Sequence, residues 1–206
     1  RVDMGDLYTM VKSGMSDYEI LEDMPDAMVH MDRLDRVRQV IIGERYKLVF
    51  RDLQVVYLFG APGSGKTRYV MDKYGYANVY RVTDYVHPFD NYQGQDVVVF
   101  EEFRSSFLIG QMLGYLDGYP LELPCRYNNK YACYTKVYVI TNVALHEQYP
   151  FVQKEEYVSW LAFLRRITRV VRFHADGTRQ EFDIRLVRDN WNLVARSPFD
   201  DFDDER

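Results

Sequence analysis

The spacing of apolar residues changes near residue 49, and this change divides the chain into two predicted parts. Up to residue 48 apolar side chains recur every three or four positions, which is typical of amphipathic helices. Beyond it, short apolar runs rich in β-branched residues alternate with helix-like stretches, as buried strands and helices do. The predicted strands are 55–59, 79–82, 97–100, 137–141 and 169–173. This alternation predicts an α/β fold with a largely parallel sheet flanked by helices, preceded by a small all-helical segment.

Three short helices are predicted before residue 49. The first, Asp6–Lys12, ends at Gly14, and the second begins at the capping-box pair Ser16 and Glu19. Asp26 is expected to cap the third helix. The apolar positions of that helix are Met28, Met31, Leu34, Val37, Val40 and Ile41. Helices this short bury little surface alone, so we expect residues 1–48 to pack on the main domain or on another copy of the chain. A DNA-binding helix-turn-helix is the weaker alternative, because acids outnumber bases up to residue 32.

The main domain is expected to span residues 49–190. Near its end, a turn at 175–178 joins the strand 169–173 to a last predicted strand, 179–187. Residues 191–206 form an acidic tail, which is expected to be solvated and disordered. A docking peptide for a partner protein is the alternative function of this tail.

Composition and charge narrow the classes of function. The 206 residues are 47% hydrophobic, which is enough for a core, and the formal net charge is −5. Residues 199–206 account for −4 of that charge, so the body is near neutral and any nucleic-acid contact must be local. Two cysteines cannot build a disulfide framework, which fits a reducing compartment. No apolar run is long enough to span a membrane and no signal peptide is present, and the first residue, Arg1, suggests an excised fragment.

Residues 60–67 match the phosphate-binding pattern G-x-x-x-x-G-K-[ST] in full. The eight residues are Gly60, Ala61, Pro62, Gly63, Ser64, Gly65, Lys66 and Thr67. Glycines allow the backbone torsions that point amides at phosphate oxygens. Lys66 supplies a positive charge to the β- and γ-phosphates, and Thr67 supplies a hydroxyl to Mg²⁺. A strand before the loop and a helix after it, stopped by Gly75, complete the motif, so the loop predicts binding of a nucleoside triphosphate.

Two carboxylates, Glu101 and Glu102, directly follow the apolar strand 97–100. ATPases with this kind of loop need an acid at the tip of a neighbouring strand to hold the Mg²⁺ shell, and a second to orient or deprotonate water. Glu101 is assigned to the metal together with Thr67, and which glutamate activates water is left open. The alternative is an ordinary strand that ends in solvated acids.

A polar side chain also ends the strand 137–141. Asn142 can sense the γ-phosphate and hold the attacking water, whereas the alternative is a turn-forming Asn after a strand. Its position relative to the loop and the acids favours the catalytic function.

A hairpin is predicted between these two strands, around Asn128 and Asn129. It places Lys130 at or beside the tip, with Tyr127 and Tyr131 on either side. A cation between aromatic rings suits a phosphodiester backbone with stacked bases, so Lys130, Asn129 and Tyr131 are the predicted nucleic-acid contacts. A surface hairpin with a solvated lysine is the alternative.

The pair Arg165 and Arg166 follows a predicted helix, 155–163. One of the two is expected to supply a cation to the γ-phosphate of a neighbouring subunit's ATP, although a simple surface cluster is the alternative. The four histidines are scattered and form no metal-binding pair, so none is given a catalytic role.

The order of these motifs resembles that of superfamily-3 helicases. More closely, the chain is similar to the ATPase part of replication initiator (Rep) proteins of rolling-circle plasmids and small circular single-stranded DNA viruses, and it looks most like the bacterial plasmid type. The stretches that carry this resemblance are 81–90, 95–106, 115–127 and 162–167.

The resemblance implies an AAA+-type fold and assigns a role to each motif. Residues 60–67 would be Walker A, 97–102 Walker B, 120–134 the pore hairpin and Asn142 the sensor of motif C. ATP and Mg²⁺ would be the cofactors, and Arg165 or Arg166 the arginine finger. The pair of glutamates departs from the more frequent Asp-containing version of Walker B.

The resemblance also implies an assembly and a setting. Residues 1–48 would be the helical collar that drives ring formation, typically of a hexamer, with single-stranded DNA in the pore. The setting would be the bacterial cytoplasm, with replication proteins as candidate partners of the acidic tail. Whole Rep proteins carry an N-terminal nicking endonuclease, and nicking and ligation are not expected of this chain.

The function predicted from the sequence is therefore an ATP-dependent DNA helicase domain that acts in rolling-circle replication. One alternative is an RNA helicase or RNA-remodelling ATPase of the same superfamily. Another is an ATP-bound replication scaffold that does not unwind, although a scaffold needs no water-activating acid. A small-molecule kinase fits poorly, because the hairpin and Asn142 have no role there.

Overall fold

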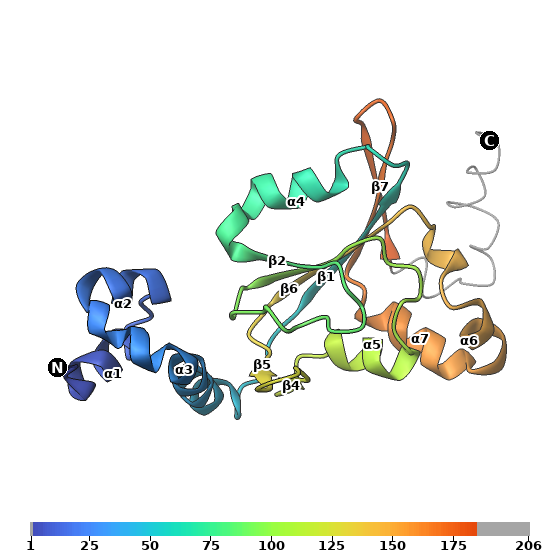
Figure 1. Ribbon diagram of the computed structural model, residues 1–206. Helices are drawn as coiled ribbons and strands as arrows, with labels where there is room; N and C mark the ends of the chain where they lie inside the picture. The colour runs from blue at the N-terminus through green and yellow to red at the C-terminus, as the bar shows by residue number, and fades with distance from the viewer. Residues whose placement is uncertain (1, 185–206) are drawn as a thin grey trace.

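The computed structural model describes residues 2–184, and its centre is a six-stranded sheet (Figure 1). The strands run in the order β2-β3-β6-β1-β7-β8, and all are parallel except β8, which pairs antiparallel with β7. Their bounds are β1 Gln54–Gly60, β2 Val79–Val82, β3 Val97–Phe100, β6 Lys136–Thr141, β7 Arg169–Phe173 and β8 Arg179–Phe182. The predicted α/β fold with a largely parallel sheet is confirmed.

Helices cover both faces of the sheet, as the continuous apolar strands require (Figure 1). Alternate residues of β1 point to opposite faces: Val55 and Tyr57 enter one core, and Val56 and Leu58 the other. The second core is closed by α4 (Lys66–Tyr74). The first is closed by α5 (Ile109–Tyr115) and α7 (Tyr157–Arg166), with α6 (Pro150–Glu155) beside α7. The shorter 3₁₀ turns of this part are η2 (Tyr76–Asn78) and η3 (Leu145–Glu147).

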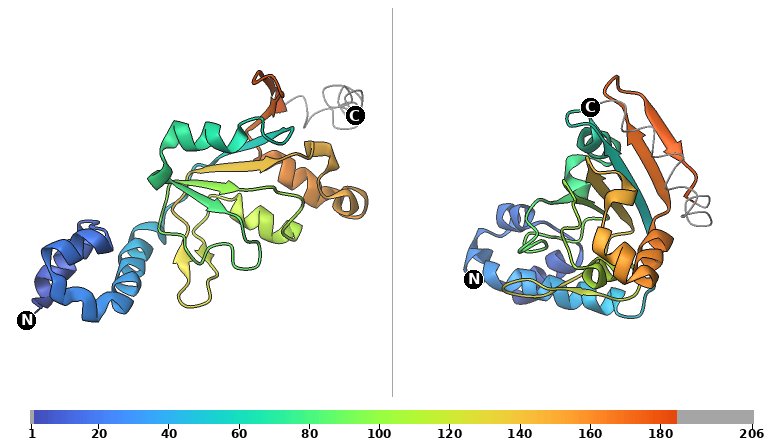
Figure 2. Two further views of the ribbon diagram at one scale, coloured as in Figure 1. Left: turned by 45° about the horizontal axis from the view of Figure 1, so that its top comes forward. Right: turned by 90° about the vertical axis from the view of Figure 1, so that its right-hand side faces the viewer.

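The N-terminal helices stand to one side of the sheet and have a small core of their own (Figure 2). They are α1 (Met4–Lys12), α2 (Asp17–Asp23), the 3₁₀ helix η1 (Pro25–His30) and α3 (Met31–Tyr46). The buried residues of this core are Leu7, Val11, Ile20, Ala27 and Leu34. The predicted capping box of Ser16 and Glu19 is present at the start of α2.

Two details of the N-terminal prediction are wrong. Asp26 does not cap the third helix, because it lies inside η1, and α3 begins at Met31 without a side-chain cap. Met28 and Val40 are 70% and 69% exposed, so they are not part of the buried stripe. The reason is geometric, since η1 has the tighter 3₁₀ winding and takes Met28 out of the phase of α3.

Two predicted bounds near the C-terminus also change. The helix expected at 155–163 is split at Glu156, whose backbone is not helical, so Arg165 and Arg166 lie in the last turn of α7. Cations are favoured there by the helix dipole. The last strand ends at Phe182, and the rest of the predicted strand and the acidic tail lie outside the described residues.

A small second sheet lies beside α3. It is a hairpin of β4 (Glu122–Leu123) and β5 (Lys130–Tyr131), which pair antiparallel. The linker after α3 is fixed by the buried Arg51, whose guanidinium donates to the carbonyl oxygens of Tyr134, Asp117 and Tyr119 at 2.8, 3.1 and 3.2 Å. Over residues 2–184, no helix is both long and apolar enough to cross a membrane.

Candidate active site

The loop between β1 and α4 has the backbone of a phosphate cradle. It lies at the carboxyl end of the parallel strands, beyond the end of β1 (Figure 1). Gly65 caps α4 with a left-handed backbone (φ +87°), and Gly63 has a similar φ of +75°. A Cβ on Gly60 would lie 2.0 Å from the carbonyl oxygen of Phe173, so no side chain fits there. Gly60 is therefore required by the close approach of the Phe173 backbone, and Gly63 and Gly65 by their positive φ angles.

Lys66 spans the loop with its ammonium group. Its Nζ donates to the carbonyl oxygens of Gly60 and Ala61 at 2.7 and 2.8 Å, and to Ser64 Oγ and Asn142 Oδ1 at 3.3 Å each. Burial lowers the pKa of Lys66, while the nearby glutamates oppose that shift. These four acceptors hold the Lys66 ammonium group inside the loop, where the phosphate oxygens of a nucleotide would contact it.

Glu101 is fixed by two partners and is 8% exposed. Thr67 Oγ1 donates to its Oε2 at 3.0 Å, and Arg81 Nε donates to its Oε1 at 2.8 Å. The loop hydroxyl and the strand acid are therefore neighbours, which is the arrangement that a Mg²⁺ ion between them would use. The contact supports Thr67 and Glu101 as the metal-side pair.

Arg81 was not among the site residues predicted from the sequence. Its signal was weak: it is a single cation in the short apolar strand 79–82, and the parallel partner of that strand, β3, leads directly into Glu101. Because Arg81 and Glu101 are 20 residues apart, only the pairing of β2 with β3 brings them together.

Glu102 differs from Glu101 in its exposure and in its backbone conformation. Its side chain is exposed, and its backbone is left-handed with φ +47°. This conformation costs a non-glycine residue about 1–2 kcal/mol. It turns the chain sharply after β3, so that two consecutive glutamates take different environments.

One cavity of about 300 Å³ brings five of the eight predicted loop residues together with the predicted residues of both strand tips. It is lined by Pro62, Gly63, Gly65, Lys66, Thr67, Arg68, Glu101, Glu102, Ile140, Thr141 and Asn142. No group of three or more His, Cys, Asp or Glu side chains in residues 2–184 forms a ready-made metal site. Thr67 and Glu101 would instead hold a metal jointly with the phosphates of a nucleotide, which fits their contact.

A buried glutamine ties the loops after β3 and β6 together. Gln148 is 1% exposed, and its Nε2 donates to Tyr57 Oη and to the carbonyl oxygen of Phe103, both at 3.0 Å. Its Oε1 accepts from the amide and the hydroxyl of Ser105 at 2.7 and 2.8 Å. Tyr57 Oη in turn donates to the carbonyl oxygen of Val143 at 2.7 Å. The segments that follow Glu102 and Asn142 are thus held by one polar network.

The two candidate finger arginines have different surroundings. Arg166 is half-buried; its Nη2 donates to Asp117 Oδ2 at 2.8 Å, and its Nη1 donates to the carbonyl oxygen of Ala162 at 2.8 Å. Arg165 is exposed and makes no ion pair or side-chain hydrogen bond to any described residue. The side chain of Arg166 is therefore held by contacts within its own chain, whereas that of Arg165 is exposed and free to contact another molecule.

Lys130 lies beside the hairpin turn, as predicted, but it is not exposed as a DNA contact would be. It is the first residue of β5 and is only 8% exposed. Its Nζ donates to the carbonyl oxygens of Asp90 and Tyr92 at 2.9 and 2.8 Å. The loop after β2 covers it and supplies these acceptors, which the hairpin sequence could not reveal.

The other hairpin residues face different neighbours. The amide of Tyr131 donates to Gln39 Oε1 of α3 at 3.1 Å, and its ring would lie 2.5 Å from a Cβ on Gly43. Asn129 is exposed at the turn, and Tyr127 is 88% exposed. The solvent-facing part of the hairpin is therefore its tip, whereas Tyr131 packs against the N-terminal helices.

Comparisons with known proteins agree with this geometry. Residues 56–143 match the RNA helicase family, a span that includes the phosphate loop, both glutamates and Asn142. The chain is 32% identical to the replication-associated protein of goose circovirus over 124 residues, which are 59% of this chain and 40% of the relative. It is 27% identical to that of pigeon circovirus over 61% of this chain and 38% of the relative. It is 28% identical to the replication-associated protein of beak and feather disease virus over 56% of this chain and 38% of the relative.

The chain spans about 40% of the length of these curated relatives. Among solved structures it is similar to the S. cerevisiae Hsp104-ADP complex, with 16% identity, 84% of this chain and 33% of that chain covered, and a TM-score of 0.41. It is also similar to the Hsp104:casein complex, with 18% identity, 73% and 36% covered, and a TM-score of 0.38. The chain is thus similar to the RNA helicase family over residues 56–143, and to viral replication-associated proteins over about 60% of its length.

Proposed function

We propose that this chain is an ATP- and Mg²⁺-dependent DNA helicase domain that unwinds DNA during rolling-circle replication. The observation that carries the proposal is the single cavity in which Lys66, the Thr67–Glu101 pair, Glu102 and Asn142 meet. A phosphate loop alone supports binding, whereas the two acids and the amide supply what hydrolysis needs.

Each residue of the cavity has a distinct task. The loop amides and Lys66 hold the phosphates, and Thr67 with Glu101 holds Mg²⁺, which neutralises charge on the phosphate oxygens. Glu102 is exposed to the cavity and accepts a proton from the attacking water. Asn142, whose Oδ1 already contacts Lys66, positions that water or the γ-phosphate.

The site is completed by a second subunit of a ring, with Arg165 as the finger. Arg165 is exposed and lies before Thr168, whose amide donates to the carbonyl oxygen of Val55 at the start of β1. The phosphate loop begins at Gly60, five residues after Val55, which is roughly 16 Å along β1. Arg165 therefore lies at the far end of the sheet from its own loop and serves the ATP of a neighbour. A hexamer, with residues 1–48 as its collar, is the assembly we propose.

The hairpin tip is the element that follows the DNA strand. Arg126 and Tyr127 are exposed there, and a cation beside an aromatic ring suits a phosphodiester backbone with stacked bases. Because Lys130 is covered, its contribution is to hold the hairpin on the loop after β2. The bacterial plasmid setting, the cytoplasm as its compartment and the docking role of the acidic tail remain predictions.

Replacing Lys66 tests the assignment directly. Lys66→Ala is expected to abolish ATP turnover, because it removes the charge that the phosphates meet. Lys73→Ala is the matched control, since Lys73 is an exposed lysine of the same helix. Steady-state phosphate release with and without single-stranded DNA measures both. Normal turnover in Lys66→Ala would sink the proposal, and ATP binding without turnover in the unmodified chain would favour a scaffold.

An RNA helicase is the second candidate, because the matching family is described by that name. Backbone contacts and base stacking serve both polymers. Phosphate release is therefore to be measured with single-stranded DNA and RNA of the same sequence and length, at the same salt concentration. Greater stimulation by RNA would replace the DNA assignment.

A further inference from the structure

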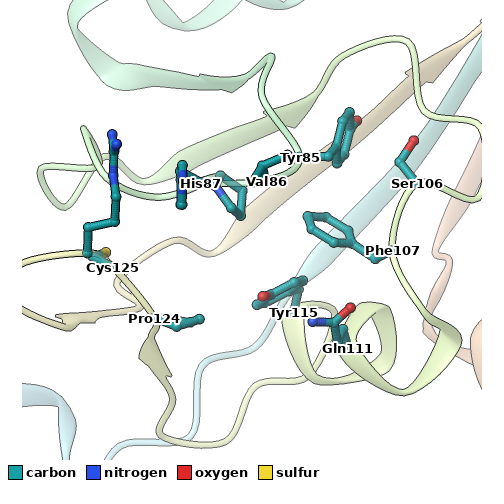
Figure 3. A pocket seen from close by; sticks show the side chains of 11 residues that line it. Tyr85, Val86, His87, Ser106, Phe107, Gln111, Tyr115, Pro124 and Cys125 are labelled. Carbon is teal, nitrogen blue, oxygen red and sulfur yellow. The ribbon is translucent and has the colours of Figure 1, made fainter.

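A second cavity, of about 350 Å³, lies between the loop after β2, the loop after β3, α5 and the first residues of the hairpin turn, 124–126 (Figure 3). It shares no lining residue with the ATP cavity. Its size is at the lower end of the range of small-molecule sites, which is enough for one nucleobase. Of its lining residues only Arg126, at the hairpin tip, has a task in the proposed function.

Three aromatic rings form the apolar wall of this cavity. Phe107 stands edge-on to Tyr85 and to Tyr115, with ring centroids 5.0 Å apart in both pairs. Phe107 and Tyr115 are each 6% exposed, so their positions are fixed by packing. Figure 3 shows the three rings together on one side, with His87 and Cys125 across from them. The exposed part of this wall is mainly the ring of Tyr85, which is partly exposed and is backed by the two buried rings, so it offers a base a stacking surface at little entropic cost.

Polar and charged groups lie at the rim. Gln111 and His87 are exposed, and Arg126 uses only its Nε and its backbone amide to bind Asp90, at 2.5 and 3.1 Å. The carboxylate of Asp90 offsets part of the positive charge of Arg126. An aromatic wall with a guanidinium and an imidazole at the opposite rim matches a base that is joined to a phosphate.

One side chain joins this cavity to the ATP site. The ring of Tyr85 lines the cavity, and its hydroxyl donates to the carbonyl oxygen of Glu101 at 2.7 Å. Glu101 is the residue that Thr67 and Arg81 hold. A group that displaces the Tyr85 ring would therefore stretch or break a hydrogen bond to the peptide between Glu101 and Glu102.

We propose that this cavity receives one unpaired base of the DNA strand that the hairpin follows, and that Tyr85 conveys its occupancy to the Glu101–Glu102 peptide. The inference rests on the proposed function, because it assumes that the hairpin meets single-stranded DNA. It goes further by naming the part of the strand that is bound and the residue that links binding to hydrolysis.

The test compares two probes, oligo-dT and an abasic oligonucleotide of the same length, at the same salt concentration. Because base stacking on aromatic side chains is typically worth a factor of about ten or more per base, the unmodified chain should bind oligo-dT about tenfold tighter. In a Tyr127→Ala background, where the exposed tip ring no longer stacks on bases, Gln111→Trp fills the cavity from its exposed rim and should reduce the difference to less than about twofold. Leu108→Trp is the matched control on the same segment, since Leu108 is 77% exposed and does not line the cavity.

Several outcomes separate this inference from the proposed function. If both probes bind equally to the unmodified chain and both stimulate ATP hydrolysis, the base cavity is wrong and the helicase proposal stands. A full tenfold preference in a folded Gln111→Trp in that background would also overturn the cavity. Should that variant fail to fold, Val86→Trp fills the cavity from another exposed position. If neither probe binds and ATP is not hydrolysed, both proposals fail.

The role of Tyr85 has its own readout. Tyr85→Phe keeps the ring and removes the hydroxyl, so oligo-dT binding should be retained while the ratio of DNA-stimulated to basal hydrolysis falls toward one. An unchanged ratio would show that the cavity is not linked to the ATP site through this hydroxyl.

Discussion

At the scale of single residues, the two adjacent glutamates show how one peptide can divide two chemical tasks. Glu101 is almost fully buried between Thr67 and Arg81, and its carboxylate has both oxygens engaged. Glu102 is exposed to the same cavity and has a left-handed backbone. A metal ligand benefits from fixed orientation, whereas a general base needs access to water. The structure thus favours Glu101 for the metal and Glu102 for the proton.

Glutamine substitutions should separate these tasks. Glu102→Gln removes the base but little else, so ATP binding should persist while hydrolysis falls by about 10²–10⁴-fold. Glu101→Gln removes the charge beside Thr67, so Mg²⁺-dependent ATP binding itself should weaken. Nucleotide titrations with and without Mg²⁺, together with phosphate release, measure both effects. Glu155→Gln, at an exposed position of α6, is the control. Equal loss of ATP binding in the two active-site variants would contradict the division.

At the scale of elements, the strands were predictable and the side-chain partners were not. The predicted strands 79–82, 97–100 and 169–173 have the same bounds in the structure. In each case the strand ends where the β-branched, apolar run ends. Parallel strands bring their carboxyl ends to one edge, so the loop, both glutamates and Asn142 could be placed together from sequence. Arg81, Gln148 and the partners of Lys130 depend on contacts between distant segments, which local pattern does not encode.

Lys130 shows this limit most clearly. From sequence, a lysine between two tyrosines at a turn fits a solvated tip as well as it fits a buried position. The strand register alone does not decide whether the side chain of Lys130 points to solvent or into the protein. The carbonyl oxygens of Asp90 and Tyr92, about 40 residues upstream, accept its ammonium hydrogens. A buried ammonium with acceptors is held firmly, because losing them would leave a desolvated charge.

The hairpin should therefore respond differently to two substitutions. Lys130→Ala leaves two carbonyl oxygens without a donor and should lower the free energy of unfolding by about 1–3 kcal/mol, with DNA stimulation lost indirectly. Tyr127→Ala removes an exposed ring, so it should leave stability within about 0.5 kcal/mol and weaken binding of single-stranded DNA. Denaturant titration and DNA binding at fixed salt measure the two properties. An unchanged midpoint in Lys130→Ala, with DNA binding lost, would restore Lys130 as a direct contact.

At the scale of the whole molecule, a single chain holds the parts of the proposed site at opposite ends of the sheet. The phosphate loop follows the carboxyl end of β1, whereas Arg165 precedes β7, which begins beside the start of β1. The N-terminal helices form a separate small core and meet the rest of the chain through α3 and the hairpin. Several large apolar side chains remain exposed on them, among them Tyr18, Val29 and Val40. This arrangement suits a protein whose active sites are completed by assembly.

Substituting the two arginines separately tests that arrangement. Arg166→Ala breaks the bond to Asp117 and should lower the free energy of unfolding by about 1–3 kcal/mol. Arg165→Ala should leave stability unchanged and reduce hydrolysis by about 10³-fold or more, as loss of an arginine finger does. Thermal unfolding, phosphate release and a mass measurement in the presence of nucleotide distinguish the two variants.

Mixing the variants tests whether Arg165 acts between subunits. Arg165→Ala retains a working phosphate loop, and Lys66→Ala retains a working finger, so each is expected to be inactive alone. In a mixed ring, some interfaces pair an intact loop with an intact Arg165, and part of the hydrolysis should return. Arg165→Ala combined with Lys66→Ala in one chain is the control, because mixing it with either single variant creates no complete interface. Mixed single variants that form rings yet stay inactive would place the catalytic cation elsewhere.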